Sequence, residues 1–178
     1  MHPPFLKRST MQETPQQYVI RILSNLEGKD SLSILKSTPQ KIKRIISGVN
    51  KRTLTARPEP GKWSVTEIVA HLAETEIVLG WRYRSIAGKN GVTLQPFEQD
   101  DWARNSKYAQ ANIIEMLELY SVVRRANIRF LTGLTKEQWQ QHGMHQERGK
   151  ETIAHLVNLE AGHDINHFKQ IQKILTKK

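Results

Sequence analysis

The 178-residue sequence contains no cysteine, which excludes disulfides, thiolate metal ligands and a cysteine nucleophile. It has no run of 18 apolar residues, so we expect no membrane-spanning helix. The first residues, Met-His-Pro-Pro-Phe-Leu-Lys-Arg, lack the apolar core of a signal peptide, and we therefore expect a cytoplasmic protein. Any site of the zinc type must be built from His, Asp and Glu side chains.

Several common motifs are also missing. We find no Walker or Rossmann glycine pattern and no His-Glu-x-x-His of a zincin-type protease. Strand-type alternation of useful length, internal repeats and low-complexity segments are absent as well. Nucleotide-binding α/β folds are therefore not expected, and helical periodicity dominates the chain.

Positive charge is in excess, with 27 Lys and Arg against 17 Asp and Glu and a formal net charge of +10. Such a balance permits binding of nucleic acid or another anionic partner. We find no tight basic cluster and no stacking platform of aromatic and basic residues, so we interpret the excess as a solvated basic face. Much of it lies in one segment and comprises Lys36, Lys41, Lys43, Arg44, Lys51, Arg52, Arg57 and Lys62.

Helix start and stop signals divide the chain into amphipathic segments. The pattern predicts an all-α protein, a four-helix bundle with additional N-terminal and connecting short helices, as a single domain over residues 1–178. We expect residues 1–13 to be extended or poorly ordered. The predicted helices run from the Thr14 cap to Gly28, over a short stretch capped by Asp30, from Thr38-Pro39 to about Val49, from the Ser64 cap to Gly88, over Ser106–Leu131, from the Thr135 cap to about Trp139, and over Glu151–Leu175.

Two features modify this scheme. Proline lacks the backbone N–H that an α-helix uses, so Pro39 should prevent one straight helix through residues 30–48. The long connector Gly88–Lys107, rich in Gly, Asn, Pro and acidic residues, could cover one end of the bundle as a lid or rim.

Three histidines are the strongest functional signal. His163 and His167 are four residues apart, so on a helix they lie on one face, in register with the apolar residues and with Glu160. His71 lies at the edge of the core stripe of an earlier helix. Core histidines held by ordinary hydrogen bonds are the alternative, but several buried polar groups in one stripe need a joint explanation. Three protein ligands with an open position are typical of a catalytic metal.

Other titratable residues are weaker candidates. Glu160 shares the stripe with two of the histidines, and we take it as the candidate catalytic acid or base, whereas most other acids should be solvated. The unit Glu160-x-x-His163 also matches one half of a carboxylate-bridged di-iron site, but the second unit is missing, which favours one metal ion. Secondary candidates are Glu74, Asp164, Asp100 and Asp101; His142 and His145 are expected on a surface loop, and His155 off the stripe.

These residues resemble the DinB-like superfamily of metal-dependent enzymes over nearly the whole chain. The resemblance is carried by Trp63-Ser64 before His71-Leu72 and by His163-x-x-x-His167-x-x-Gln170-Ile171, within the segments Lys62–Glu76, Arg82–Ala87, Phe97–Ala103 and His163–Ile171. It implies a four-helix bundle in which His71, His163 and His167 bind one divalent ion, and it implies a homodimer in many members. Asp100 or Asp101 and Gln170 match recurrent positions with supporting roles.

The resemblance also implies the kind of reaction. Assigned members include S-transferases and isomerases that use a low-molecular-weight thiol, and many others are described as hydrolases. We therefore expect a thiol-dependent S-transferase or a hydrolase of a small molecule, with one Zn, Ni or Fe ion, since imidazole suits all three metals. The alternative is a basic helical binding protein with an anionic partner such as nucleic acid, whose metal is structural or incidental.

Overall fold

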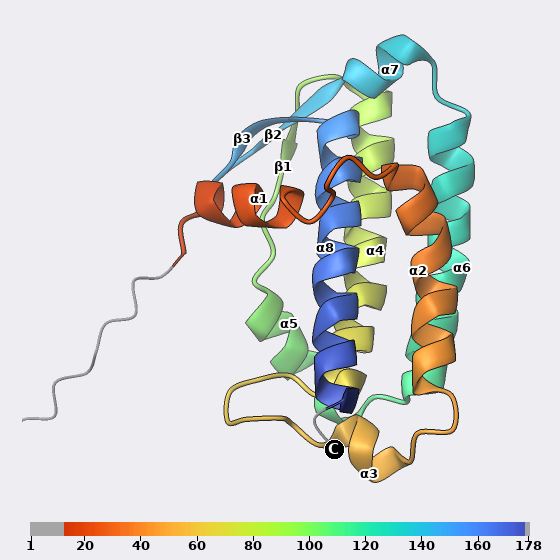
Figure 1. Ribbon diagram of the computed structural model, residues 1–178. Coiled ribbons are helices and arrows are strands. Elements are labelled where there is room, and N and C mark those ends of the chain that lie inside the picture. Colours follow the sequence, from red (N-terminus) through yellow and green to blue (C-terminus); the bar gives the residue numbers. More distant parts are fainter. Residues whose placement is uncertain (1–12, 177–178) are drawn as a thin grey trace, which may run out of the picture.

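The computed structural model describes residues 13–176 and forms a four-helix bundle (Figure 1). The bundle consists of α2 (Ser31–Ile46), α4 (Val65–Gly88), α6 (Ile113–Thr132) and α8 (Ile153–Thr176). Both α2 and α4 pack against α6 and α8, so α2 and α4 occupy opposite corners. The predicted fold class is confirmed, whereas the expectation for residues 1–13 falls almost entirely outside the described residues.

Shorter elements surround the bundle. Helix α1 crosses α8 near its middle, and α3 and α5 lie toward the end of the bundle opposite the sheet (Figure 1). Within the described residues, no helix is long and apolar enough to cross a membrane. The short helices are α1 (Pro15–Leu23), α3 (Lys51–Thr55), α5 (Gln99–Asn105), the 3₁₀ turn η1 (Tyr108–Gln110) and α7 (Lys136–Gln140).

A small sheet was not predicted. It contains β1 (Val92–Leu94), β2 (His142–His145) and β3 (Gly149–Thr152), with β2 in the middle, parallel to β1 and antiparallel to β3. Each strand has only three or four residues, too few for alternation to be recognised. The sheet fixes the connector after α4 against the segment that precedes α8.

The predicted helix starts at Thr14, Ser64 and Thr135 are confirmed as complete capping boxes. Two predicted boundaries are wrong. Helix α1 ends at Leu23 rather than Gly28: a first turn follows at residues 24–25, and the positive φ angles at residues 27 and 28 belong to a second turn. The helix expected from residue 106 begins instead at Ile113, after a separate short helix and a 3₁₀ turn.

The expectation for Pro39 is also wrong, since α2 continues through it. Proline at position 39 leaves the carbonyl of Leu35 without its helical partner. That carbonyl accepts a hydrogen bond from Nη1 of the buried Arg124 at 2.9 Å. A long-range contact therefore satisfies the group that the proline releases, and the helix does not break.

The core has two apolar clusters with a polar layer between them. One cluster includes Leu79 of α4 and Leu156 of α8, and the other includes Leu72 of α4 and Ile171 of α8. Between these apolar positions lie Glu76 on α4 and Glu160, His163, Asp164 and His167 on α8, all of them buried, and the buried His71 directly precedes Leu72. The middle section of the bundle therefore contains polar side chains, and the candidate site lies there.

Candidate metal centre

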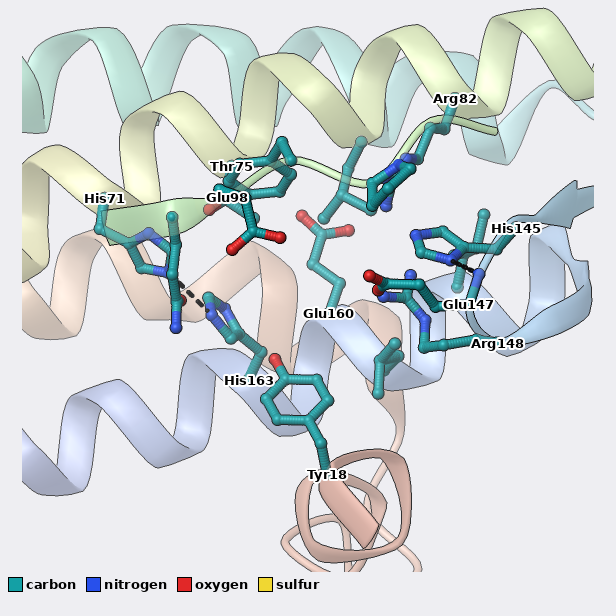
Figure 2. Close-up of a pocket in the computed structure, with 16 residues that line it drawn as sticks. Tyr18, His71, Thr75, Arg82, Glu98, His145, Glu147, Arg148, Glu160 and His163 are labelled. Carbon is teal, nitrogen blue, oxygen red and sulfur yellow. Dashed lines mark hydrogen bonds between the residues drawn. The ribbon is translucent and has the colours of Figure 1, made fainter. Parts of the chain in front are cut away.

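The structure brings His71 of α4 together with His163 and His167 of α8. The Nε2 atom of His163 lies 3.0 Å from Nε2 of His71 and 3.0 Å from Nε2 of His167. The nitrogens that could serve as ligands all lie within 4.8 Å of one another. Figure 2 shows the rings of His71 and His163 directed toward each other. All three residues are at least 92% buried, with exposed fractions of 2%, 8% and 7% in sequence order.

Neighbouring side chains orient two of the rings. Nδ1 of His167 lies 3.0 Å from Oε1 of Gln170, so with the amide oxygen accepting, Nδ1 carries the proton and Nε2 presents a lone pair. The indole of Trp63 packs on the ring of His71, with centroids 4.8 Å apart. Nδ1 of His71 is buried without a hydrogen-bond partner among residues 13–176.

Burial keeps the three imidazoles neutral. Loss of hydration lowers the pKa of His71 and of His163 well below the ordinary value, and His167 lowers both further. Burial also lowers the pKa of His167 to about 4. Neutral imidazole is the form that binds a metal, so this environment favours coordination.

This donor set fits one divalent ion. With Zn–N bonds of about 2.0–2.1 Å and tetrahedral angles, ligand nitrogens lie about 3.3 Å apart, close to the observed contacts of 3.0 Å. Nitrogen lone pairs that face one another repel unless a proton or a cation lies between them. A metal ion would relieve this repulsion at all three rings and would keep a fourth position for substrate or water.

A buried ionic cluster lies next to the histidines. The guanidinium of Arg124 contacts three carboxyl groups, those of Glu76 at 2.7 Å, Asp164 at 2.7 Å and Glu160 at 3.0 Å. Burial raises the pKa of Glu160 well above the ordinary value, and the Glu76 carboxyl raises it further. Glu160 also accepts a hydrogen bond from the hydroxyl of Tyr83. One cation faces three buried carboxyl groups, an arrangement that favours the protonated form of Glu160.

Two cavities are lined by different members of the three-histidine set. One cavity of about 210 Å³ is lined by His71, His163 and Glu160. A second cavity of about 470 Å³ is lined by His167 and by the neighbouring Trp63. Each cavity therefore borders at least one of the three rings.

The secondary acidic candidates lie away from the three rings. The carboxylate of Glu74 accepts a hydrogen bond from the hydroxyl of Tyr108 at 2.7 Å, and Asp164 belongs to the buried ionic cluster. Asp101 pairs with Arg104 on the surface. Of the four acids, Asp100 is the one that borders either of the two cavities described above: it lines the larger of them and is exposed. Part of the connector, residues 96–99, lines the smaller cavity and so acts as its rim.

The expectation that His145 lies on the surface is wrong. Strand β2 carries it inward, where it is 2% exposed and lines the smaller cavity. Sequence reasoning also missed Thr75 and Arg82, which line the same cavity. Both follow His71 at helical spacing, four and eleven residues later, and this periodicity was the signal that could have found them.

The eight basic residues between Lys36 and Lys62 are all exposed, and Arg57 forms an ion pair with Glu67. Their arrangement agrees with a solvated basic face. Binding of nucleic acid or another anionic macromolecule, and formation of a homodimer, stay predictions.

Comparison with known proteins places the chain in a family. Residues 34–171 match the DinB superfamily. A protein of Geobacillus kaustophilus named "Putative metal-dependent hydrolase" is 22% identical over 167 residues, which cover 93% of this chain and 91% of that protein. A protein of Oceanobacillus iheyensis with the same description is 22% identical over 147 residues, covering 82% of this chain and 83% of that one.

A solved structure has the same fold. YfiT from Bacillus subtilis, described as "a probable metal-dependent hydrolase with an unusual four-helix bundle topology", superposes with a TM-score of 0.78 at 17% identity. The match covers 99% of this chain and 93% of YfiT. Since the family match spans most of the residues and includes all three histidines, this chain belongs to the DinB superfamily.

Proposed function

We propose that this protein is a metal-dependent enzyme acting on a small molecule, with one divalent ion held by His71, His163 and His167. The observation that carries the proposal is the meeting of three buried, neutral imidazoles at Nε2 contacts of 3.0 Å beside a cavity. When bound, an ion with three neutral ligands would lower the pKa of a bound water or thiol toward neutrality. The residues around the ion would orient the substrate, exclude bulk water and transfer protons.

Glu160 is the proposed general acid. Its carboxyl borders the cavity that His71 and His163 line, and burial raises its pKa, which favours the protonated form that a general acid needs. Tyr83 and Arg124 fix the carboxyl in place. A substrate in this cavity could take the proton of Glu160 on its leaving group as the nucleophile attacks.

The two cavities support a thiol-dependent S-transferase over a hydrolase. Hydrolysis needs a site for one organic substrate. Transfer to a thiol needs a second site, which holds the thiol beside that substrate. The cavity beside His167 is also lined by Arg21, Lys62 and Lys173, together with Glu59 and Asp100. Because Arg21 pairs with Glu13, the two lysines are the proposed partners of a low-molecular-weight thiol that carries carboxylates. In the reaction, the thiol loses its proton, the sulfur–carbon bond forms, and the leaving group departs with a proton.

Metal analysis tests the site directly. We would measure metal per chain in tag-free protein as wild type, His163→Ala and His167→Ala, with His155→Ala as the control. His155 lies on the same helix but borders neither of the two cavities. We expect one equivalent of Zn, Ni or Fe in wild type and control, and its loss from the two variants with helicity retained. Full metal occupancy in His163→Ala would overturn the proposal.

Product analysis separates the two reactions. Metal-loaded protein would be incubated with 1-chloro-2,4-dinitrobenzene in the presence and absence of cysteine, and the products identified by mass spectrometry. A cysteine adduct formed only with metal-loaded protein supports the transferase. A hydroxylated product formed equally well without cysteine would show that the enzyme is a hydrolase.

A further inference from the structure

The end of the smaller cavity remote from the three histidines carries two unused hydrogen-bond donors. Figure 2 shows Arg82 of α4 and His145 of β2 on one side of the cavity, His71 and His163 on the other, and Glu160 between them. Arg82 is 4% exposed and His145 is 2% exposed. Both are therefore built into the interior rather than solvated.

The guanidinium of Arg82 is only partly satisfied. Its Nη2 donates to the backbone oxygen of Gln95 at 2.5 Å, whereas its buried Nε has no hydrogen-bond partner in the described part of the chain. Burial lowers its pKa to about 10, which still leaves it positively charged at neutral pH. The contrast with Arg124 is clear, because that buried arginine contacts three carboxyl groups.

The imidazole of His145 presents a second donor. Its Nδ1 accepts a hydrogen bond from the backbone N–H of Glu147 at 3.3 Å, so in the neutral ring the proton is on Nε2. Burial lowers the pKa of His145 to about 4, which keeps the ring neutral at physiological pH. Within residues 13–176, this buried Nε2 has no acceptor.

The charged residues that line the same cavity do not accept hydrogen bonds from these two donors. Arg148 lines the cavity but is bound by Glu151 through contacts of 2.7 and 3.1 Å. Glu98 and Glu147 also line the cavity, yet both are exposed to solvent. A buried donor without a partner costs about 1–3 kcal/mol, more on a charged group, and most such groups in folded proteins have one. A ligand group with two acceptor oxygens would give both donors a hydrogen-bond partner.

We propose that Arg82 and His145 bind a carboxylate of the substrate, so that this enzyme acts on a small carboxylic acid. The inference rests on the proposed function for the reacting end of the molecule. Nε of Arg82 and Nε2 of His145 donate to the carboxylate oxygens, and the rest of the molecule extends past Glu160 toward His71 and His163. The cavity volume of about 210 Å³ limits the substrate to a short acid.

The first test compares butanoate with butanamide, which has nearly the same shape but no charge. Binding to the full-length protein would be measured by calorimetry and by ¹H–¹⁵N spectra that include the Nε–H signal of Arg82. The protein would be used as purified and after metal removal, so that carboxylate–metal coordination is separated from this site. We expect butanoate to bind about tenfold or more tightly than butanamide and to shift the Arg82 signal in both samples.

Variants localise the effect. Arg82→Gln should weaken butanoate binding about tenfold or more, His145→Phe should weaken it less, and Arg44→Gln, which removes an exposed charge on α2, should leave it unchanged. Arg82→Lys keeps the charge without the Nε donor and should restore part of the affinity. If Arg82→Gln does not fold, the Arg82 signal and the butanoate-to-butanamide ratio in the wild type still decide the question.

Several results would overturn the inference. They are equal binding of butanoate and butanamide, an unmoved Arg82 signal, unchanged affinity in folded Arg82→Gln, no saturable binding up to about 10 mM, or a site that takes inorganic phosphate but not butanoate. None of these depends on metal content, so failure here leaves the three-histidine proposal standing. Loss of that proposal would equally leave a measured carboxylate site in place.

Discussion

Replacing Arg124 with methionine should destabilise the protein strongly. The guanidinium is 3% exposed and lies within 3.0 Å of carboxyl oxygens of Glu76, Glu160 and Asp164, so its removal leaves three buried carboxyl groups without a cation. Breaking a buried ion pair by removing one partner costs about 3–5 kcal/mol. A domain has a total stability of about 5–15 kcal/mol, so we expect a marginally folded variant at neutral pH.

The loss should depend on pH in a defined direction. Burial already raises the pKa of Glu160 and of Asp164 in the wild type, and without Arg124 the main charge that lowers them is gone. An acid whose pKa is higher in the folded state takes up a proton on folding, so its penalty is relieved as the pH falls through that pKa. The stability difference between wild type and variant should therefore shrink from pH 8 to pH 5.

Urea unfolding followed by circular dichroism measures this difference. With a urea dependence of about 2 kcal/mol per molar, the expected loss lowers the midpoint at pH 7 by about 2 M. Arg125→Met is the matched control, because Arg125 is the next residue on α6 and is exposed. A loss below about 1 kcal/mol at pH 7, or a loss that stays constant down to pH 5, would refute the role assigned to Arg124.

Three further perturbations test other parts of the structure. Gln170→Ala removes the acceptor for His167 Nδ1, so metal affinity should fall about 10–100-fold in a chelator competition; an affinity equal to that of the exposed control Gln172→Ala would contradict this. Gly162→Ala places a methyl group against the carbonyl oxygen of Ile22, so α1 must shift, and we expect a loss of about 1–3 kcal/mol in urea unfolding; an unchanged midpoint would rule out this close approach. Metal-free protein should lose stability below about pH 6.5, because the histidines bind protons when unfolded but have lowered pKa values when folded. The loss should approach about 1.4 kcal/mol per pH unit for each histidine, and for His167 should continue down to about pH 4; equal urea midpoints at pH 7 and pH 5 would exclude it.

Local patterns predicted much of the fold and part of the site. The capping boxes at Ser64 and Thr135 depend only on residues three positions apart, and they place the helix starts correctly. The positions of His163 and His167 on one buried face follow from helical periodicity in the same way. The sequence of α8 was therefore enough to predict two histidines side by side in the interior.

Contacts between distant residues decided the remainder. The helix through Pro39 persists because Arg124, 85 positions later, donates to the carbonyl that the proline leaves open. The inward position of His145 depends on the pairing of β2 with β1 and β3, strands too short to have a recognisable pattern.

The sequence by itself determined the approximate positions of the long helices and the faces they bury, because backbone hydrogen bonding and side-chain periodicity act over a few residues. It also placed two histidines one turn apart. Only the tertiary structure decided that His71 meets them, that one arginine holds three carboxyl groups, and that Arg82 and His145 face one cavity. Those relations depend on how whole helices and strands pack, and packing is set by the sum of many contacts rather than by any local pattern.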